Sequence, residues 1–234
     1  MSAPLKAALE DLLRARHLRP EGPPLRGEDR RLSPLPTGLT QVDALLDGGF
    51  PRGEVSEVHG PASSGRTGLA LALVARATRR GMLAAWVDPQ DRLDPVSAAA
   101  AGIDLQRLLW LRGGAPGRSL AECVAATGTL LGSGLFDAVV LDLAGASASE
   151  LRRLPGATWI RFQRLIEDAP SALLLVADRH VAQGPGGVSL TLAPAGLCWS
   201  GSPGPGRLLR GLRAEAGAGR YKIRRAGLEL AAFS

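Results

Sequence analysis

The chain has 234 residues, of which 45% are hydrophobic, and this length suits one sizeable domain with its own core. The formal net charge of +6 favours nucleic acid or another acidic partner without identifying either. No run of about 18 apolar residues occurs, so we expect no membrane span. The charged N-terminus is not typical of a secretory signal, and the two cysteines lack metal-ligand spacing. We therefore expect a cytoplasmic protein with free thiols, no disulfide and no bound metal.

The first 36 residues predict an arm and a linker. Leu5, Leu9 and Leu12 fall on one face of a helix over residues 1–19. Pro20 ends this helix, and the proline-rich stretch over 20–36 is typical of a linker. The apolar stripe of the arm must dock either on the protein's own core or on a partner, and the sequence leaves both open.

From residue 54 onward, strand and helix patterns alternate. Strands are expected at 54–60, 82–88, 137–145 and 171–178, and helices at 67–80, 120–131 and 158–169. Because the strands are nearly all apolar, the pattern predicts an α/β fold whose mostly parallel sheet has helices on both faces. After residue 185 we expect short strands joined by glycine-rich turns, which would finish the sheet with antiparallel hairpins. The predicted division is a core over 37–200 and a basic C-terminal β-hairpin segment over 201–234.

The stretch GPASSGRT differs by one residue from the phosphate-binding pattern G-x-x-x-x-G-K-[ST]. It follows a predicted strand and opens a predicted helix, so its backbone N–H groups would form an anion cradle. Thr67 stands where a hydroxyl ligand of Mg²⁺ belongs, and Asp142 ends a buried strand where the second acid of such a site belongs. The candidate nucleotide-contacting residues are Gly60, Ser63, Ser64, Gly65, Arg66, Thr67 and Asp142.

Arg66 replaces the lysine of this pattern. Arginine is planar and bulkier than lysine, and it is no equivalent at such a position. Its guanidinium could fill the phosphate site and pair with Asp142 or Asp88. Alternatively it could still hold phosphate, since arginine is a good phosphate ligand. The residue alone leaves both hypotheses open.

Residues 35–67 resemble the start of the RecA ATPase core. The matching positions, in order, are Thr37, Gly38, Asp43, Gly48, Gly49, Pro51, Gly53, Glu57, Gly60, Pro61, Ser63, Ser64, Gly65 and Thr67. WVDPQDRLDP over 86–95 resembles the next RecA block. The resemblance implies a RecA-like core, and it weakens toward both ends of the chain.

The departures from this family fall on its chemistry. The glutamate that activates water in RecA-like enzymes is Gln90 here, which has no comparable basicity. Ser97 stands where RecA has a base-stacking aromatic, Arg179 where it senses the γ-phosphate with glutamine, and Gly68 where it has a second hydroxyl. The comparison implies a degenerate ATPase site with no catalytic residue and no cofactor, and even weak ATP–Mg²⁺ binding is not expected.

A small RecA-like chain with an altered site resembles the ImuA family of the bacterial ImuA–ImuB mutagenesis cassette. This resemblance implies an adaptor in SOS-induced translesion synthesis and DNA repair. The implied partners are RecA itself, an ImuB-type relative of the Y-family polymerases, and an error-prone replicative-type polymerase. Two rival hypotheses are an active RecA-like ATPase that assists recombination and a modulator of RecA filaments.

The C-terminal region carries the densest basic run of the chain. It could bind DNA phosphates or an acidic protein surface, or it could be a solvated face. We favour the last two over DNA. The candidate partner- or DNA-binding residues are Leu5, Leu9 and Leu12 in the arm and Arg207, Arg210, Arg213, Arg220, Lys222, Arg224 and Arg225 in this run.

Overall fold

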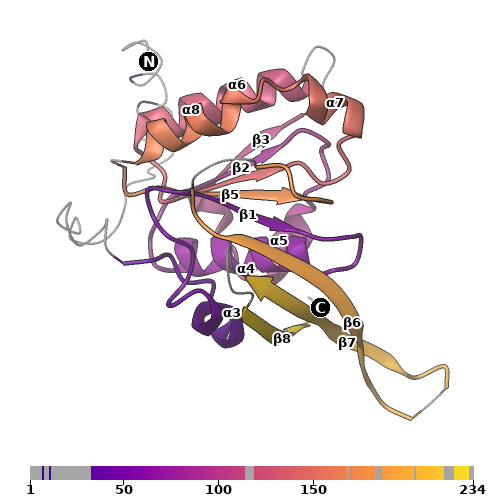
Figure 1. Cartoon of the computed structure of the whole chain (residues 1–234). Helices are drawn as coiled ribbons and strands as arrows, with labels where there is room; N and C mark the ends of the chain where they lie inside the picture. The colour runs from indigo at the N-terminus through magenta and orange to yellow at the C-terminus, as the bar shows by residue number, and fades with distance from the viewer. Residues whose placement is uncertain are drawn as a thin grey trace.

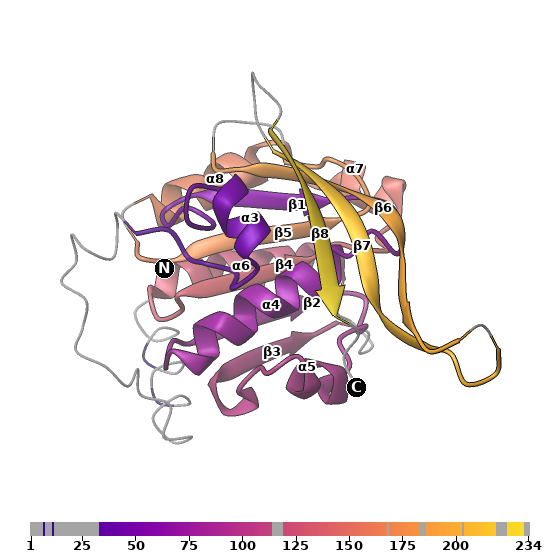
Figure 2. The same ribbon diagram turned by 90° about the horizontal axis from the view of Figure 1, so that it is seen from below.

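The computed structural model describes residues 7, 11, 33–113, 119–167, 169–182, 186–202, 204–218 and 224–231. The described strands form one mixed sheet in the order β3-β2-β4-β5-β1-β6-β7-β8. The first five strands in this order and the β1–β6 pair run parallel, whereas β6, β7 and β8 are antiparallel. Helices α6, α7 and α8 lie on one side of the sheet, and α3, α4 and α5 lie on the other (Figures 1 and 2). The predicted α/β fold class is therefore confirmed.

The boundaries of the elements follow in chain order. The strands are β1 (Val55–His59), β2 (Ala84–Asp88), β3 (Leu108–Arg112), β4 (Ala138–Asp142), β5 (Ala172–Ala177), β6 (Ser189–Ser200), β7 (Leu208–Ala218) and β8 (Arg224–Ala231). The helices are α3 (Thr40–Leu45), α4 (Arg66–Arg79), α5 (Pro95–Ala100), α6 (Leu120–Ser133), α7 (Ala148–Arg153) and α8 (Ala157–Ile166), with a 3-10 turn η1 (Leu105–Arg107). The strand at 108–112 and the short helices α3, α5 and α7 were not among the predicted elements.

The parallel strands divide their apolar residues between two cores. Side chains alternate across a strand, so Val140 and Leu174 face α4, while Leu141 and Leu173 face α6 and α8. All residues of β2, β4 and β5 are buried, which explains why their sequences are continuously apolar rather than alternating. Because β1, β4 and β5 pair in parallel, their carboxyl ends lie at one edge of the sheet.

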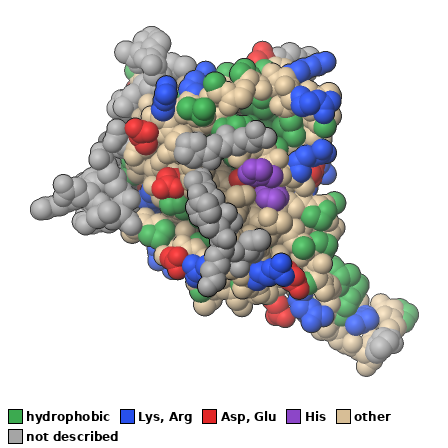
Figure 3. All heavy atoms as spheres, in the orientation of Figure 1, with side chains coloured by type: hydrophobic (Ala, Val, Ile, Leu, Met, Phe, Trp, Pro, Cys, Tyr) green, Lys and Arg blue, Asp and Glu red, His purple; other side chains and the backbone are tan. Residues whose placement is uncertain are grey.

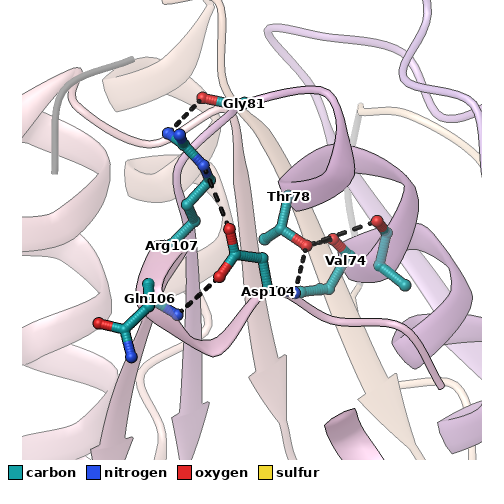
Figure 4. A network of polar contacts seen from close by, with 7 residues as sticks. Val74, Thr78, Gly81, Asp104, Gln106 and Arg107 are labelled. Atoms are coloured by element: carbon teal, nitrogen blue, oxygen red, sulfur yellow. Dashed lines mark hydrogen bonds and ion pairs between the residues drawn. The ribbon is translucent and has the colours of Figure 1, made fainter. Parts of the chain in front are cut away.

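A polar network fixes the turn that leads into the edge strand β3 (Figure 4). The Thr78 hydroxyl donates to the Val74 carbonyl at 2.9 Å and accepts the Asp104 N–H at 3.1 Å. The Asp104 carboxylate accepts the Gln106 N–H and pairs with Arg107, whose guanidinium also donates to the Gly81 carbonyl. The end of α4 thereby positions η1 and the strand that follows it.

The C-terminal part corrects one expectation. Instead of several short strands, the described part of this region forms the longer strands β6, β7 and β8 of the same sheet. The pairing register shifts between Pro194 and Gly196 and between Cys198 and Trp199. A β-bulge of this kind bends a strand without ending it, so β6 continues through residues that suggested turns. The distal part of the β6–β7 hairpin projects away from the body of the molecule (Figures 1 and 2).

Several predicted features lie outside the described residues. These are the arm with Leu5, Leu9 and Leu12, and the basic residues Arg220 and Lys222. Within the part of the chain that the structure describes, no helix is long and apolar enough to cross a bilayer.

Candidate nucleotide-binding site

The loop Gly60–Thr67 connects β1 to α4, as the sequence predicts. Gly65 has a φ of 91° and precedes α4 directly, which is a left-handed conformation that favours glycine. No side chain caps the N–H groups of the first helical turn. Such unpaired N–H groups, together with the helix dipole, favour an anion. The Ser64 hydroxyl is buried beside Gly60 and has no hydrogen-bond partner.

Arg66 folds back over this loop. Its guanidinium donates one hydrogen bond to the Gly60 carbonyl at the start of the loop and another to the Asp178 carboxylate just after β5. The side chain is 10% exposed. The other oxygen of Asp178 accepts the Gly145 N–H at 2.9 Å, so Arg66 and Asp178 tie together the loops after β1, β4 and β5. Arg66 therefore turns into the loop, as one of the two hypotheses expected. Its carboxylate partner is Asp178, so the expected pairing with Asp142 or Asp88 is wrong.

The carboxylates of Asp88 and Asp142 accept hydrogen bonds from other groups instead. Asp88, at the end of β2, accepts the N–H groups of Arg92 and Leu93 and the indole N–H of Trp110. It therefore holds the turn after its strand. Asp142, at the end of β4, accepts the Ala144 N–H at 3.0 Å.

The carboxyl group of Asp142 has a higher pKa than an ordinary aspartate. Burial raises the pKa of Asp142 to about 6, and the nearby charge of Asp88 adds to this effect. The hydrogen bond from Ala144 and the positive charges of Arg66 and Arg92 oppose it. Asp142 is 6% exposed, so most of its charge must be balanced by the protein itself. At neutral pH the group is ionised but sits close to its titration range.

Leu230 of β8 covers the first turn of α4. A Cβ atom built at Gly65 would collide with the Leu230 Cδ1 atom and lie 3.3 Å from the Leu212 Cδ2 atom of β7. A Cβ at Gly68 would lie 3.7 Å from the same Leu230 methyl group. Arg66 and Leu230 thus contact the loop and the first turn of α4 from different parts of the fold. In this arrangement the Arg66 guanidinium is bonded to protein oxygens, so it does not fit a bound phosphate without moving.

The other family departures lie on several elements. Gln90 is half-buried, and Arg179 is exposed directly after Asp178. The Ser97 hydroxyl donates to Asp94, the N-cap of α5, so it serves the local helix start. Thr67 is exposed at the first turn of α4, where its hydroxyl is accessible.

Two histidines that are distant in sequence meet beside the loop. The rings of His59 and His180 lie 5.6 Å apart, and Figure 3 shows a patch of histidine side chains at the surface. His180 Nδ1 lies 2.8 Å from the buried Glu57 carboxylate, and His59 Nε2 lies 3.1 Å from the Thr191 hydroxyl. Burial lowers the pKa of His59. Among the described residues, no cluster of three or more histidines, cysteines or carboxylates is arranged to hold a metal ion.

The described basic residues of the C-terminal run do not form one stripe. Arg207, Arg210 and Arg213 lie on the β6–β7 hairpin. Arg224 donates to Asp47 and to the Ala44 carbonyl, so it attaches β8 to α3. Arg225 lines a separate groove of about 340 Å³ on the sheet face, together with residues of β6 and β7. A common role for the whole run is not supported by this placement.

Sequence reasoning missed Asp178 and Leu230 as parts of the site. Asp178 carried a usable signal, because it follows a buried strand in the same way as Asp142 does. Leu230 carried none, since a leucine in a C-terminal strand is an ordinary core residue.

The parallel sheet, the loop after β1 and the acid at the end of β4 define a P-loop protein of the α/β class. A sequence model of the RecA N-terminal domain matches residues 25–152, more than half of the chain, and the protein belongs to this family. Protein RecA of Lactobacillus acidophilus is 40% identical over 121 residues, which cover 50% of this chain and 32% of that protein.

Two further relatives give a similar picture. Protein RecA of Symbiobacterium thermophilum is 42% identical over 113 residues, covering 48% of this chain and 31% of the relative. Protein RecA of Prochlorococcus marinus (strain MIT 9303) is 49% identical over 79 residues, covering 34% and 21%. The chain thus aligns with a third or less of the length of these curated relatives.

Proposed function

We propose that this protein is a non-catalytic member of the RecA family that serves as a docking platform in DNA-damage-induced translesion synthesis. The observation that carries the proposal is the Arg66 guanidinium, which bonds to the Gly60 carbonyl and to Asp178 inside the phosphate-binding loop. In this role the positive charge that would hold a phosphate is used to join three loops of the protein. The proposal includes the ImuA-like assignment and the cytoplasm as the site of action.

Three features of the site support this proposal. Arginine presents a rigid fork that can bond to two acceptors at once, and here the acceptors are protein oxygens rather than phosphate oxygens. Leu230 packs a methyl group against Gly65 and Gly68 at the first turn of α4, which adds an apolar side chain next to the loop. Gln90 replaces the water-activating glutamate that the family resemblance implies at this position. The fold would then serve as a scaffold, since an inherited fold does not carry its function with it.

The proposed partners follow from the ImuA resemblance. They are RecA, an ImuB-type Y-family polymerase relative and an error-prone replicative-type polymerase, with DNA contact secondary. Co-elution of the purified protein with each partner in size-exclusion chromatography would test this part. Failure of all three to co-elute would contradict the docking role.

The nucleotide site is tested by calorimetric titration of the full chain with Mg²⁺-ATP. We expect no heat of binding from the wild type and none from Leu230→Ala alone, since Arg66 would still close the loop. The double variant Arg66→Lys/Leu230→Ala opens both sides of the loop, and we expect it to bind ATP measurably. Binding by the wild type in the micromolar range, about −8 kcal/mol, together with ATP turnover, would overturn the non-catalytic assignment.

One set of observations favours a second candidate function, an active or nucleotide-switched RecA-like ATPase. Thr67 is exposed, Asp142 is retained, and the Ser64 hydroxyl is buried without a partner beside Gly60. If the wild type binds ATP, the variant Gln90→Glu distinguishes the two: faster turnover than the wild type would favour the ATPase, and unchanged turnover would not.

A further inference from the structure

The distal β6–β7 hairpin exposes large apolar side chains. Leu197, Trp199, Leu208 and Leu209 are 48%, 43%, 56% and 47% exposed, and they make up half of the strongly exposed large hydrophobic residues in the described part of the chain. Scattered exposed leucines are ordinary, but a contiguous apolar group on a projecting element marks an interaction site. Figure 3 shows hydrophobic and basic side chains next to each other along this projection.

The pairing of the strands connects most of these exposed side chains to apolar residues of the core. Leu197 pairs with Leu212, and Trp199 pairs with Leu209, so each pair lies on one face of the hairpin. Leu212 in turn pairs with Leu230 of β8, which packs over the first turn of α4. An apolar strip therefore begins at the phosphate-binding loop, where it is covered, and runs outward along the hairpin, where it is exposed.

Arginines flank this strip, and no acidic residue lies between 179 and 214. The Arg207 guanidinium lies 5.1 Å from the centre of the Trp199 ring, and Arg210 donates to the Ser200 hydroxyl at 2.7 Å. Arg213 packs beside Gly196. Tryptophan and arginine are the residues most enriched where binding energy concentrates in protein interfaces.

We propose that the distal β6–β7 hairpin is a docking site for an acidic, apolar segment of a partner protein. Its leucines and Trp199 would contact apolar side chains of the partner, and Arg207, Arg210 and Arg213 would face the partner's carboxylates. A second copy in two-fold contact would bring like charges together, which disfavours self-association through this surface. Nucleic acid would use the arginines and Trp199 but would leave three exposed leucines without apolar contacts.

The inference rests on the proposed docking role, yet its test is separate from the nucleotide titration. A phage library of random 16-residue peptides is selected on the immobilised full-length protein, and one enriched peptide is synthesised with a fluorescent label. We expect enriched peptides to combine aspartate or glutamate with leucine or aromatic residues. Anisotropy should show binding that weakens at least tenfold in Leu208→Ser/Leu209→Ser and in Trp199→Ala.

A matched control is Val96→Ser, which removes an apolar side chain that is 75% exposed on α5, away from the hairpin. This variant should bind the peptide as the wild type does. No enrichment, or binding that all variants retain, would overturn the docking site, whatever the outcome with ATP. Tighter binding of a labelled thirty-residue oligothymidylate than of the peptide, lost in Arg207→Ala/Arg210→Ala, would replace the proposal with a nucleic-acid site. ATP turnover with intact peptide binding would instead overturn the non-catalytic role alone.

Discussion

Replacing Asp142 by asparagine is expected to stabilise the folded protein at neutral and alkaline pH. The carboxyl group lies at the end of a buried strand, and burial raises its pKa from the ordinary 3.8 to about 6. A group whose pKa is raised on folding binds its proton more tightly in the native state. Its contribution to stability is therefore fully present below pH 4 and is lost as the pH rises toward and past 6.

The size of this effect follows from the shift. About two pKa units at 1.36 kcal/mol each correspond to about 3 kcal/mol between the protonated and ionised limits. Asparagine cannot ionise, and its amide oxygen can still accept the Ala144 N–H. The variant should thus be about 3 kcal/mol more stable than the wild type at pH 8, and this advantage should vanish near pH 4.

Urea unfolding followed by tryptophan fluorescence at several pH values between 4 and 8 measures this difference directly. Comparing variant with wild type at each pH cancels the other titrating groups. Asp94→Asn is the control, because the Ser97 hydroxyl lowers the pKa of exposed Asp94, and that variant should change in the opposite direction. A stability difference for Asp142→Asn that does not depend on pH, or a loss of stability at pH 8, would refute the reasoning.

Three further substitutions test the packing and capping of the fold by urea unfolding. Leu174→Ala empties a fully buried position in β5 and should cost about 2–5 kcal/mol, whereas a loss below about 1 kcal/mol would contradict its burial. Ser119→Ala removes one half of the capping box with Glu122 at the start of α6 and should cost about 1 kcal/mol. Arg52→Ala removes the buried ion pair between Arg52 and Asp137 and should cost about 3–5 kcal/mol at neutral pH; a neutral result would show that this pair is dispensable.

Arg66 and Leu230 contact the loop in different ways, so replacing each of them should have a different effect on nucleotide binding. Arg66 acts through hydrogen bonds to Gly60 and Asp178, so its replacement loosens three loops at once. Leu230 acts by filling space over Gly65, so its replacement opens only one side of the loop. Nucleotide binding by the single and double variants separates these contributions.

Local sequence patterns were enough to predict most strands of the parallel sheet. Strands β2, β4 and β5 are short, continuously apolar runs between helical patterns, and such signals are local enough to recognise without a structure. The loop Gly60–Thr67 was predictable for the same reason, because its spacing, the preceding strand and the following helix are consecutive in the chain. The edge strand β3 escaped prediction, since its half-buried side chains follow no clear alternation.

The side chains that contact the loop come from residues far apart in the sequence, so local patterns could not identify them. Arg66 and its partner Asp178 are separated by 112 residues, and Asp142 and Asp88 were equally plausible partners from the sequence. Their carboxylates hold backbone groups of their own turns, which local sequence does not reveal. Leu230 reaches Gly65 because β8 ends an antiparallel ribbon whose register is set by β-bulges in β6 and β7. Contacts of this kind depend on the register between distant strands, and residue types alone carry no record of that register.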